Sequence, residues 1–259
     1  MAQDTAPTPC ALVVGAGDRP GTGAAIAERA AREGLHVFIA GRTQSKLDAL
    51  VSHIESVGGT ATGIVADCTD ATAVEALFEQ ISASGASLRL AVHNMAAPNI
   101  PHGFLKTDAD FFSNHWQTSV YAGYLMAQGA IRQMREQDID APYGRGTLIF
   151  TGASASLRGK ARFSAFASAK AGLRNMAQAV AREFGPEDIH VAHVIIDGVI
   201  DGQFVRNAGG NLAKLWLKSK GNDGALDPEA IADAFWMLHR QPRNAWTHEL
   251  DLRPFKEDW

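Results

Sequence analysis

The sequence predicts an α/β fold: a single domain, residues 1–259, built on a doubly wound, Rossmann-like parallel sheet of about seven strands. Short apolar runs alternate with helical patterns of about ten to twenty residues along nearly the whole chain. The runs are almost continuously apolar, which is typical of strands that are buried on both faces. Because crossovers between parallel strands are right-handed, helices are expected on both faces of the sheet.

The predicted strands share an apolar core and polar or glycine-rich flanks. They are Ala11–Val14, His36–Gly41, Thr60–Asp67, Leu88–His93, Thr147–Thr151, His190–Ile196 and a final edge strand, Ala245–Leu252. A long helical stretch is expected between about Asp108 and Glu136, and the last helix is expected to start at Asp227 and Pro228. Residues 1–9 form a polar arm without a predicted element.

Composition narrows the classes of function. With 259 residues and 46% hydrophobic content the chain can bury one substantial core, and its net charge of −4 comes from interspersed acids and bases. No basic stripe indicates nucleic acid or an anionic membrane surface. Only Cys10 and Cys68 are present, so neither a disulfide framework nor a metal site is expected. The segment MAQDTAPTPC lacks the features of a secretory signal, and we expect a cytoplasmic protein that acts on a small molecule.

A glycine-rich loop follows the first predicted strand. Gly17, Gly21 and Gly23 give the pattern G-x-x-x-G-x-G, and Gly15 begins a longer alternative that ends on the same two glycines. Glycine lets the backbone approach a pyrophosphate closely, and the following helix N-terminus stabilises its charge. The position inside a βαβ unit predicts nucleotide binding, and the register of the loop stays open between the two spacings.

The end of the second strand favours NADP over NAD. Roughly twenty residues beyond the glycine loop, an acidic residue would bind the adenosine ribose of NAD, but the sequence there reads Ala40, Gly41 and Arg42. A guanidinium at Arg42, helped by Arg19 in the glycine loop, suits the additional phosphate of NADP because it offers paired, charge-assisted hydrogen bonds. The alternative is that Arg42 only begins a solvated loop.

The stretch TLIFTGASASLRGKARFSAFASAKAGLR, residues 147–174, carries the chemistry. It reads as a buried strand, a loop rich in serine and glycine, and a helix of small residues with one cation, Lys170, in its otherwise apolar or neutral middle. Phe166 lies four residues earlier on the same helical face, and Phe163 lies seven residues earlier.

This order of strand, hydroxyl loop and lysine-bearing helix resembles the catalytic segment of the short-chain dehydrogenase/reductase family. The resemblance covers nearly the whole chain, and FTGASASLRG and HVAHVIIDG look like an atypical branch with Phe in place of the catalytic Tyr. It implies an NADP(H)-dependent oxidoreductase, assembled as a homodimer or homotetramer, with Lys170 on the nicotinamide ribose. It also implies cofactor contacts from residues that follow the predicted strands, namely Asp67, Cys68, Asn94 and Ile200. For Asp67, capping of the helix beginning near Asp70 is the structural alternative.

The departures from the family pattern gather at the nicotinamide end. Phe166 occupies the place of the proton-exchanging Tyr, and Phe163 fills the place it would have in the enoyl-reductase spacing. The family's Ser falls on Ala153, which leaves Ser154, one residue on, as the candidate hydroxyl. The family's Asn falls near Ser119 or Val120. The proton donor is therefore expected to be non-standard: Ser154, His93, Tyr121 or Tyr124, or water.

Residues 198–227 interrupt the regular pattern. They contain an amphipathic piece, residues 212–218, and apolar residues that include Phe204, Leu215 and Trp216. An insert beyond a strand's carboxyl end lies over the ligand crevice in such folds, so this segment is interpreted as a substrate lid, the alternative being a surface excursion. The side chains of residues 198–227 do not identify the substrate.

Three hypotheses follow from the sequence. The first is the NADP(H)-dependent oxidoreductase, acting on a carbonyl or alcohol, or on a C=C or C=N bond as an enoyl reductase does. The second is a catalytically silent NADP(H)-binding protein that serves as a sensor or partner subunit. The third, a scaffold without nucleotide, requires the glycine loop and Arg42 both to be coincidental.

Overall fold

The structure, a computed structural model, describes residues 7–208, 221 and 223–256. Its centre is a seven-stranded sheet in the order β3-β2-β1-β4-β5-β6-β7, in which every neighbouring pair is parallel. The strands are β1 (Pro9–Val14), β2 (His36–Gly41), β3 (Thr60–Val65), β4 (Ser87–His93), β5 (Gly146–Thr151), β6 (Ile189–Ile196) and β7 (Glu249–Leu252). The predicted doubly wound fold is confirmed.

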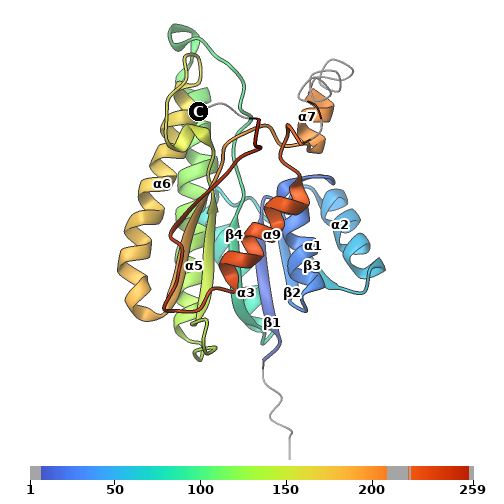
Figure 1. Ribbon diagram of the computed structural model, residues 1–259. Coiled ribbons are helices and arrows are strands. Elements are labelled where there is room, and N and C mark those ends of the chain that lie inside the picture. The colour runs from blue at the N-terminus through green and yellow to red at the C-terminus, as the bar shows by residue number, and fades with distance from the viewer. Residues whose placement is uncertain (1–6, 209–220, 222, 257–259) are drawn as a thin grey trace, which may run out of the picture.

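Helices cover both faces of the sheet (Figure 1). The helices on one face are α1 (Thr22–Arg32), α2 (Gln44–Ser56) and α9 (Pro228–His239), and those on the other are α3 (Ala71–Ala83), α4 (Ala109–Trp116), α5 (Ala122–Arg135) and α6 (Ser164–Phe184). A short helix, α7 (Gln203–Ala208), follows β6. Single turns are found at η1 (Phe104–Lys106), η3 (Ser154–Ser156) and η4 (Gly185–Glu187).

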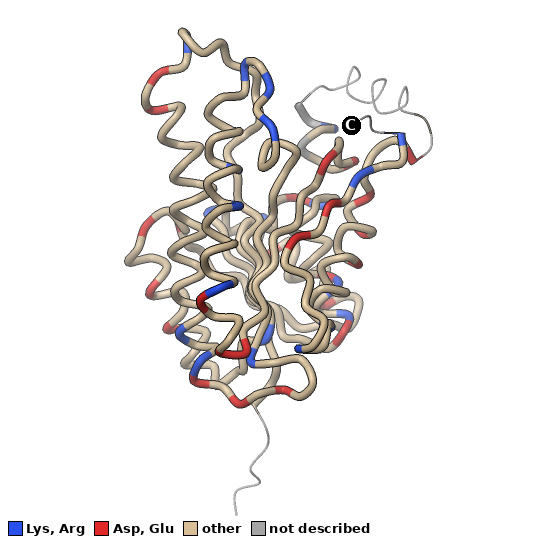
Figure 2. The backbone as a smooth tube through the Cα atoms, turned by 60° about the vertical axis from the view of Figure 1, so that its left-hand side comes forward, with Lys and Arg blue, Asp and Glu red and all other residues tan. Residues whose placement is uncertain are grey.

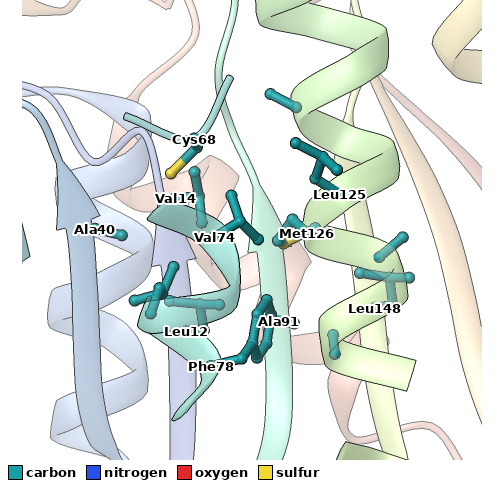
Figure 3. Close-up of a cluster of buried hydrophobic side chains, with 14 of the residues drawn as sticks. Leu12, Val14, Ala40, Cys68, Val74, Phe78, Ala91, Leu125, Met126 and Leu148 are labelled. Atoms are coloured by element: carbon teal, nitrogen blue, oxygen red, sulfur yellow. The ribbon is translucent and has the colours of Figure 1, made fainter. Parts of the chain in front are cut away.

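Two apolar cores lie on the two sides of the sheet. On the α3 and α5 side, Leu12, Phe78 and Met126 meet between strands and helices (Figure 3), and each of the three is at most 7% exposed. On the other side, α1 packs against α9 over the β1 and β4 strands. Burial of apolar side chains on both faces explains why the strands read as continuous apolar runs.

The predicted long helix between Asp108 and Glu136 is interrupted in its middle. Asp108 begins α4 as its cap, accepting from the Phe111 amide at 2.7 Å. A π-helical turn, η2 (Gln117–Tyr121), then separates α4 from α5. Such turns insert an extra residue into the helix and often occur at functional sites.

The sheet changes direction between β1 and β4. From β1 the chain adds β2 and β3 to one side, and β4 starts the other side. Ligands of doubly wound proteins bind beyond the carboxyl ends of the strands at this switch point. The glycine loop follows β1 and Asn94 follows β4, so both lie there.

Lys and Arg are interspersed with Asp and Glu along the outer elements (Figure 2). None of the helices in the described part of the chain is long and apolar enough to span a bilayer. The amphipathic piece 212–218 of the expected lid, with Leu215 and Trp216, lies outside the described residues.

Candidate active site

The glycine loop is packed against the end of β4. β1 ends at Val14, whose carbonyl accepts the Asn94 amide at 2.9 Å, and the Asn94 side-chain amide donates to the Gly15 carbonyl at 2.9 Å. A Cβ on Gly23 would lie 2.6 Å from the Gly15 carbonyl oxygen. Gly15 and Gly23 are therefore the pair in close contact, which favours the longer of the two spacings. Gly17, with φ +70, makes the turn between them.

Arg42 is available to a ligand, whereas Arg19 is engaged. Arg42 is exposed directly after β2, and its guanidinium has no hydrogen bond or ion pair with any described residue. Arg19 pairs instead with Glu28 of α1. Assistance from Arg19 at an adenosine phosphate would require this ion pair to break.

Asp67 and Cys68 follow β3. Asp67 accepts from both the amide and the hydroxyl of Thr69, at 3.0 and 2.7 Å, and these bonds lower the pKa of its carboxyl. The alternative interpretation of Asp67 as a helix cap is wrong, because Asp70 itself caps α3 by accepting the Thr72 amide at 2.9 Å. The Cys68 side chain points into the core (Figure 3), where burial raises the pKa of its thiol to about 12, so only its backbone can face a ligand.

Lys170 and Phe166 share one face of α6, as the spacing predicts. Lys170 is 3% exposed and donates to the Thr151 carbonyl at 2.7 Å, while Phe166 is 8% exposed, with its ring centroid 5.9 Å from Lys170 Nζ. Among the described residues no carboxylate contacts this ammonium group. Desolvation lowers the pKa of Lys170 to about 8. Two of its three N–H groups remain for other partners.

His93 is not a proton donor. It is fully buried at the end of β4, and burial lowers the pKa of its imidazole to about 3. Its Nε2 lies 2.9 Å from the carbonyl oxygen of Ser119 in the π-helical turn. A carbonyl only accepts, so the single proton of the neutral ring is on Nε2 and is already donated. Ser119 therefore contributes its backbone where the family pattern has an Asn.

The remaining predicted groups differ in how they are placed. Phe163 precedes the first residue of α6, and its ring lies 5.9 Å from Lys160 Nζ. Ser154 begins η3 half-buried, without a side-chain hydrogen bond to any described residue. Tyr124 is 43% exposed on α5, and Tyr121 packs on the core beside it. The described structure shows no hydrogen bond or cation–π contact between Lys170 and either tyrosine.

Ile200 belongs to a segment that crosses the glycine loop. It pairs with Leu226 in an isolated bridge and packs on the α1 side of the core. Close by, the Gln203 amide donates to the Pro20 carbonyl at 2.6 Å. The start of the expected lid is therefore attached to the glycine loop.

Sequence reasoning missed a polar network between α6, β6 and β7. Arg174 binds the Glu249 carboxylate through two bonds of 2.6 and 2.7 Å, and Glu249 Oε2 lies 3.3 Å from His193 Nδ1. The other ring nitrogen of His193, Nε2, lies 3.4 Å from Ser156 Oγ. A histidine in the middle of an apolar strand and an arginine one helical turn after Lys170 were the available signals.

A second network closes the carboxyl end of β6. Asp197 is buried, and its carboxylate pairs with Arg158 at 3.0 Å and with Arg253 at 3.2 Å. Sequence reasoning did not predict this ion cluster, whose three residues are distant along the chain.

The fold and the site define a dinucleotide-binding protein of the doubly wound class. The family model described as "Enoyl-(Acyl carrier protein) reductase" matches residues 15–247. A short-chain dehydrogenase/reductase of Armillaria gallica is 32% identical over 184 residues, which is 70% of this chain and 67% of that protein. An L-rhamnose 1-dehydrogenase (NAD(P)(+)) of Azotobacter vinelandii is 30% identical over 73% of this chain and 72% of its own length.

Solved structures of other proteins have the same fold as this chain. A short-chain dehydrogenase from Rhodopseudomonas palustris superposes with a TM-score of 0.77 at 36% identity, covering 96% of this chain and 99% of that one. A metagenomic short-chain oxidoreductase in complex with NADP shares the fold, with a TM-score of 0.78 at 21% identity and coverage of 97% and 99%. The chain belongs to the short-chain dehydrogenase/reductase family of oxidoreductases.

Proposed function

We propose that this protein is an NADP(H)-dependent oxidoreductase that transfers a hydride to or from a small organic substrate and uses a proton donor other than tyrosine. The observation that carries the proposal is the convergence of the glycine loop and Lys170 at the carboxyl ends of β1 and β5. The loop has the close backbone packing that a pyrophosphate needs, and two N–H groups of Lys170 remain for ribose hydroxyls. The bound cofactor would supply the hydride chemistry.

NADP is the preferred cofactor because of Arg42. The guanidinium is exposed and has no hydrogen bond or ion pair with a described residue, and the position after β2 carries no acid that would bind the NAD ribose. Relatives of similar fold have been solved with NADP or NADPH bound. Asp67 and the backbone of Cys68 and Ile200 would border the adenine and nicotinamide ends.

The proton must come from somewhere other than residue 166. Phe166 has no proton to exchange, and His93 has already donated its only one. The hydroxyls of the η3 turn remain, with Ser154 the residue nearest to the family's serine in sequence. Residues 198–227 would act as the lid, a role supported by the contact of Gln203 with the glycine loop. We further propose a cytoplasmic homodimer or homotetramer.

The test combines binding and turnover. NADPH and NADH are titrated against the protein by nucleotide fluorescence, and consumption or formation of NADPH is then followed with panels of aldehydes, ketones, enones, imines and alcohols. Tight NADPH binding with turnover of any panel member supports the proposal. Absence of nucleotide binding would refute it.

A second candidate is a silent NADP(H)-binding protein. It is favoured by the loss of two of the family's proton-handling side chains, at Ala153 and Phe166. Tight NADPH binding without turnover across all five panels would decide for it. Turnover of enones alone would instead indicate a C=C reductase, for which a phenol is less strictly required.

A further inference from the structure

The network between η3, α6, β6 and β7 has the connectivity of a charge relay. From the surface inward it runs from Arg174 to Glu249, then to His193 and to Ser156 (bonds of 2.6 and 2.7, 3.3 and 3.4 Å). His193 is fully buried, whereas the side chain of Glu249 is 26% exposed. These four side chains therefore connect the buried Ser156 hydroxyl to solvent.

The proton positions along this chain follow from hydrogen-bond chemistry. Arg174 lowers the pKa of the Glu249 carboxyl, so Glu249 is ionised and can only accept. His193 must then donate from Nδ1, and its Nε2 is left as an acceptor for the Ser156 hydroxyl. Burial lowers the pKa of His193 to about 4. The positive charges of Lys170 and Arg174 also lower this pKa, whereas the negative charge of Glu249 raises it. The imidazole is a neutral base at physiological pH.

Ser156 is the serine that this base reaches. It ends η3, the turn that follows β5 and packs against α6, and at 4% exposure it is buried as deeply as Lys170 at 3%. The Ala153 amide donates to Ser156 Oγ at 3.1 Å, which would stabilise negative charge developing on that oxygen. Ser154, on the same turn, has no base beside it in the described structure.

We propose that Ser156, coupled to His193 and Glu249, is the acid–base group that replaces the missing phenol and that it works chiefly as a base, in alcohol oxidation. The inference rests on the proposed function. It assigns the proton-handling role to Ser156 and not to Ser154, and it makes the hydroxyl of an alcohol the group that is deprotonated during oxidation.

The O–H bond of the substrate breaks and its proton bonds to Ser156 Oγ, while the Ser156 proton moves to His193 Nε2. The carbon–hydrogen bond of the substrate gives its electron pair and hydrogen as hydride to oxidised NADP, which is the two-electron acceptor, and the carbonyl forms. His193 becomes an imidazolium paired with Glu249. After the product leaves, the Nε2 proton returns to Ser156 Oγ, and the Ser156 hydroxyl releases a proton to water that enters the emptied site. In reduction every transfer reverses and requires a protonated His193.

The experiment first identifies an alcohol that the wild type oxidises with NADP, and then compares Ser156→Ala with Ser154→Ala and with a distant matched control, Ser84→Ala, an exposed serine after α3. We expect kcat to fall about 100-fold or more in Ser156→Ala, with a smaller loss in Ser154→Ala and none in Ser84→Ala. The wild-type kcat should decline at acid pH as His193 gains a proton. In Glu249→Gln this decline should move to lower pH, because the imidazolium loses its counter-charge.

A second readout needs neither cofactor nor substrate. Nitrogen NMR of histidine-labelled protein should show the His193 ring neutral and protonated on Nδ1 at pH 7, and Ser156→Ala should shift the Nε2 resonance. Protonation on Nε2 instead would overturn the inference, as would Ser156→Ala that keeps wild-type kcat and pH profile. In both cases NADPH binding and wild-type turnover would leave the proposed function standing. A wild type that binds NADPH but oxidises no alcohol would also overturn the inference.

Discussion

The ring of Phe166 lies beside the Lys170 ammonium group, with 5.9 Å between Nζ and the ring centroid. A phenol at this position would be one helical turn from a cation that favours its ionised form. We predict that Phe166→Tyr raises the rate of aldehyde and ketone reduction, which should be low in the wild type, by up to ~10²- to 10⁴-fold. Steady-state kinetics with NADPH measures the gain.

The matched control is Phe163→Tyr, which adds the same hydroxyl just before α6, on a ring whose cation–π contact is with Lys160. It should leave reduction unchanged. Because position 166 is buried, a phenol without a partner there would reduce the free energy of unfolding by roughly 1 to 3 kcal/mol. Brisk wild-type reduction that Phe166→Tyr does not alter would show that another acid already serves carbonyl reduction.

Lys170→Met should separate stability from cofactor binding. The pKa of Lys170 is lowered from 10.5 to about 8. Below pH 8 the lysine is charged in the folded protein, and burying that charge lowers the free energy of unfolding. The variant should gain unfolding free energy at pH 7, on the order of 3 kcal/mol less the lost hydrogen bond to Thr151. The gain should shrink as the pH rises from 8 to 10.5, because the unfolded lysine then also loses its proton.

The same variant should bind NADPH more weakly, since the ribose hydroxyls lose their donor. Urea denaturation at pH 7 and pH 10 measures the first effect, and fluorescence titration of NADPH the second. Unaltered NADPH affinity would remove Lys170 from the cofactor site.

Arg42→Ala should weaken NADPH binding by roughly 10-fold or more, as expected for the loss of charge-assisted bonds to a phosphate. NADH affinity should stay the same, because NADH lacks the 2′-phosphate. Arg32→Ala, an exposed arginine at the end of α1, is the control for a simple loss of surface charge. Equal loss in both variants would assign the effect to general electrostatics.

Acid should destabilise the protein through its buried histidines. The pKa values of His93 and His239 are lowered from 6.5 to about 3, and that of His193 to about 4. A histidine whose pKa is lowered by folding binds fewer protons in the folded state than in the unfolded state. The stability that these histidines contribute is therefore fully present above pH 6.5 and is lost as the pH falls toward 3.

The check is the denaturant midpoint at pH 8, 6 and 4.5. His93→Gln, which can still donate to the Ser119 carbonyl, should flatten part of the decline. A midpoint that is constant down to pH 4.5 would contradict the buried, neutral state of these rings.

The sequence predicts the sheet well because period and length are local signals. Every predicted strand is present, and the shared helical face of Phe166 and Lys170 follows from their spacing alone. The break between α4 and α5 was not predictable, because no Gly or Pro marks residues 117–121. The contact that its Ser119 carbonyl makes is with His93, which is 26 residues away in sequence.

Only those site residues that belong to one continuous sequence motif were predictable. The glycine loop and Lys170 are such motifs. The pairing of Ser156 with His193 and Glu249 joins three elements that are distant in sequence, and only the register of β5, β6 and β7 brings them together. The interpretation of His93 changed for a similar reason, since the acceptor that fixes its proton lies 26 residues away.

The Asp197 cluster joins the residue after β7 to the carboxyl end of β6. Arg253 is only 14% exposed and, with Arg158, surrounds a carboxylate whose own exposure is 2%. A protein truncated after Leu252 would lack Arg253 and leave the Asp197 carboxylate with one ion-pair partner. Removing one partner of a buried ion pair typically lowers the free energy of unfolding by about 3 to 5 kcal/mol. Affinity tags for biochemical work on this protein therefore belong at the amino end, where β1 enters the sheet on the side opposite the crevice (Figure 1).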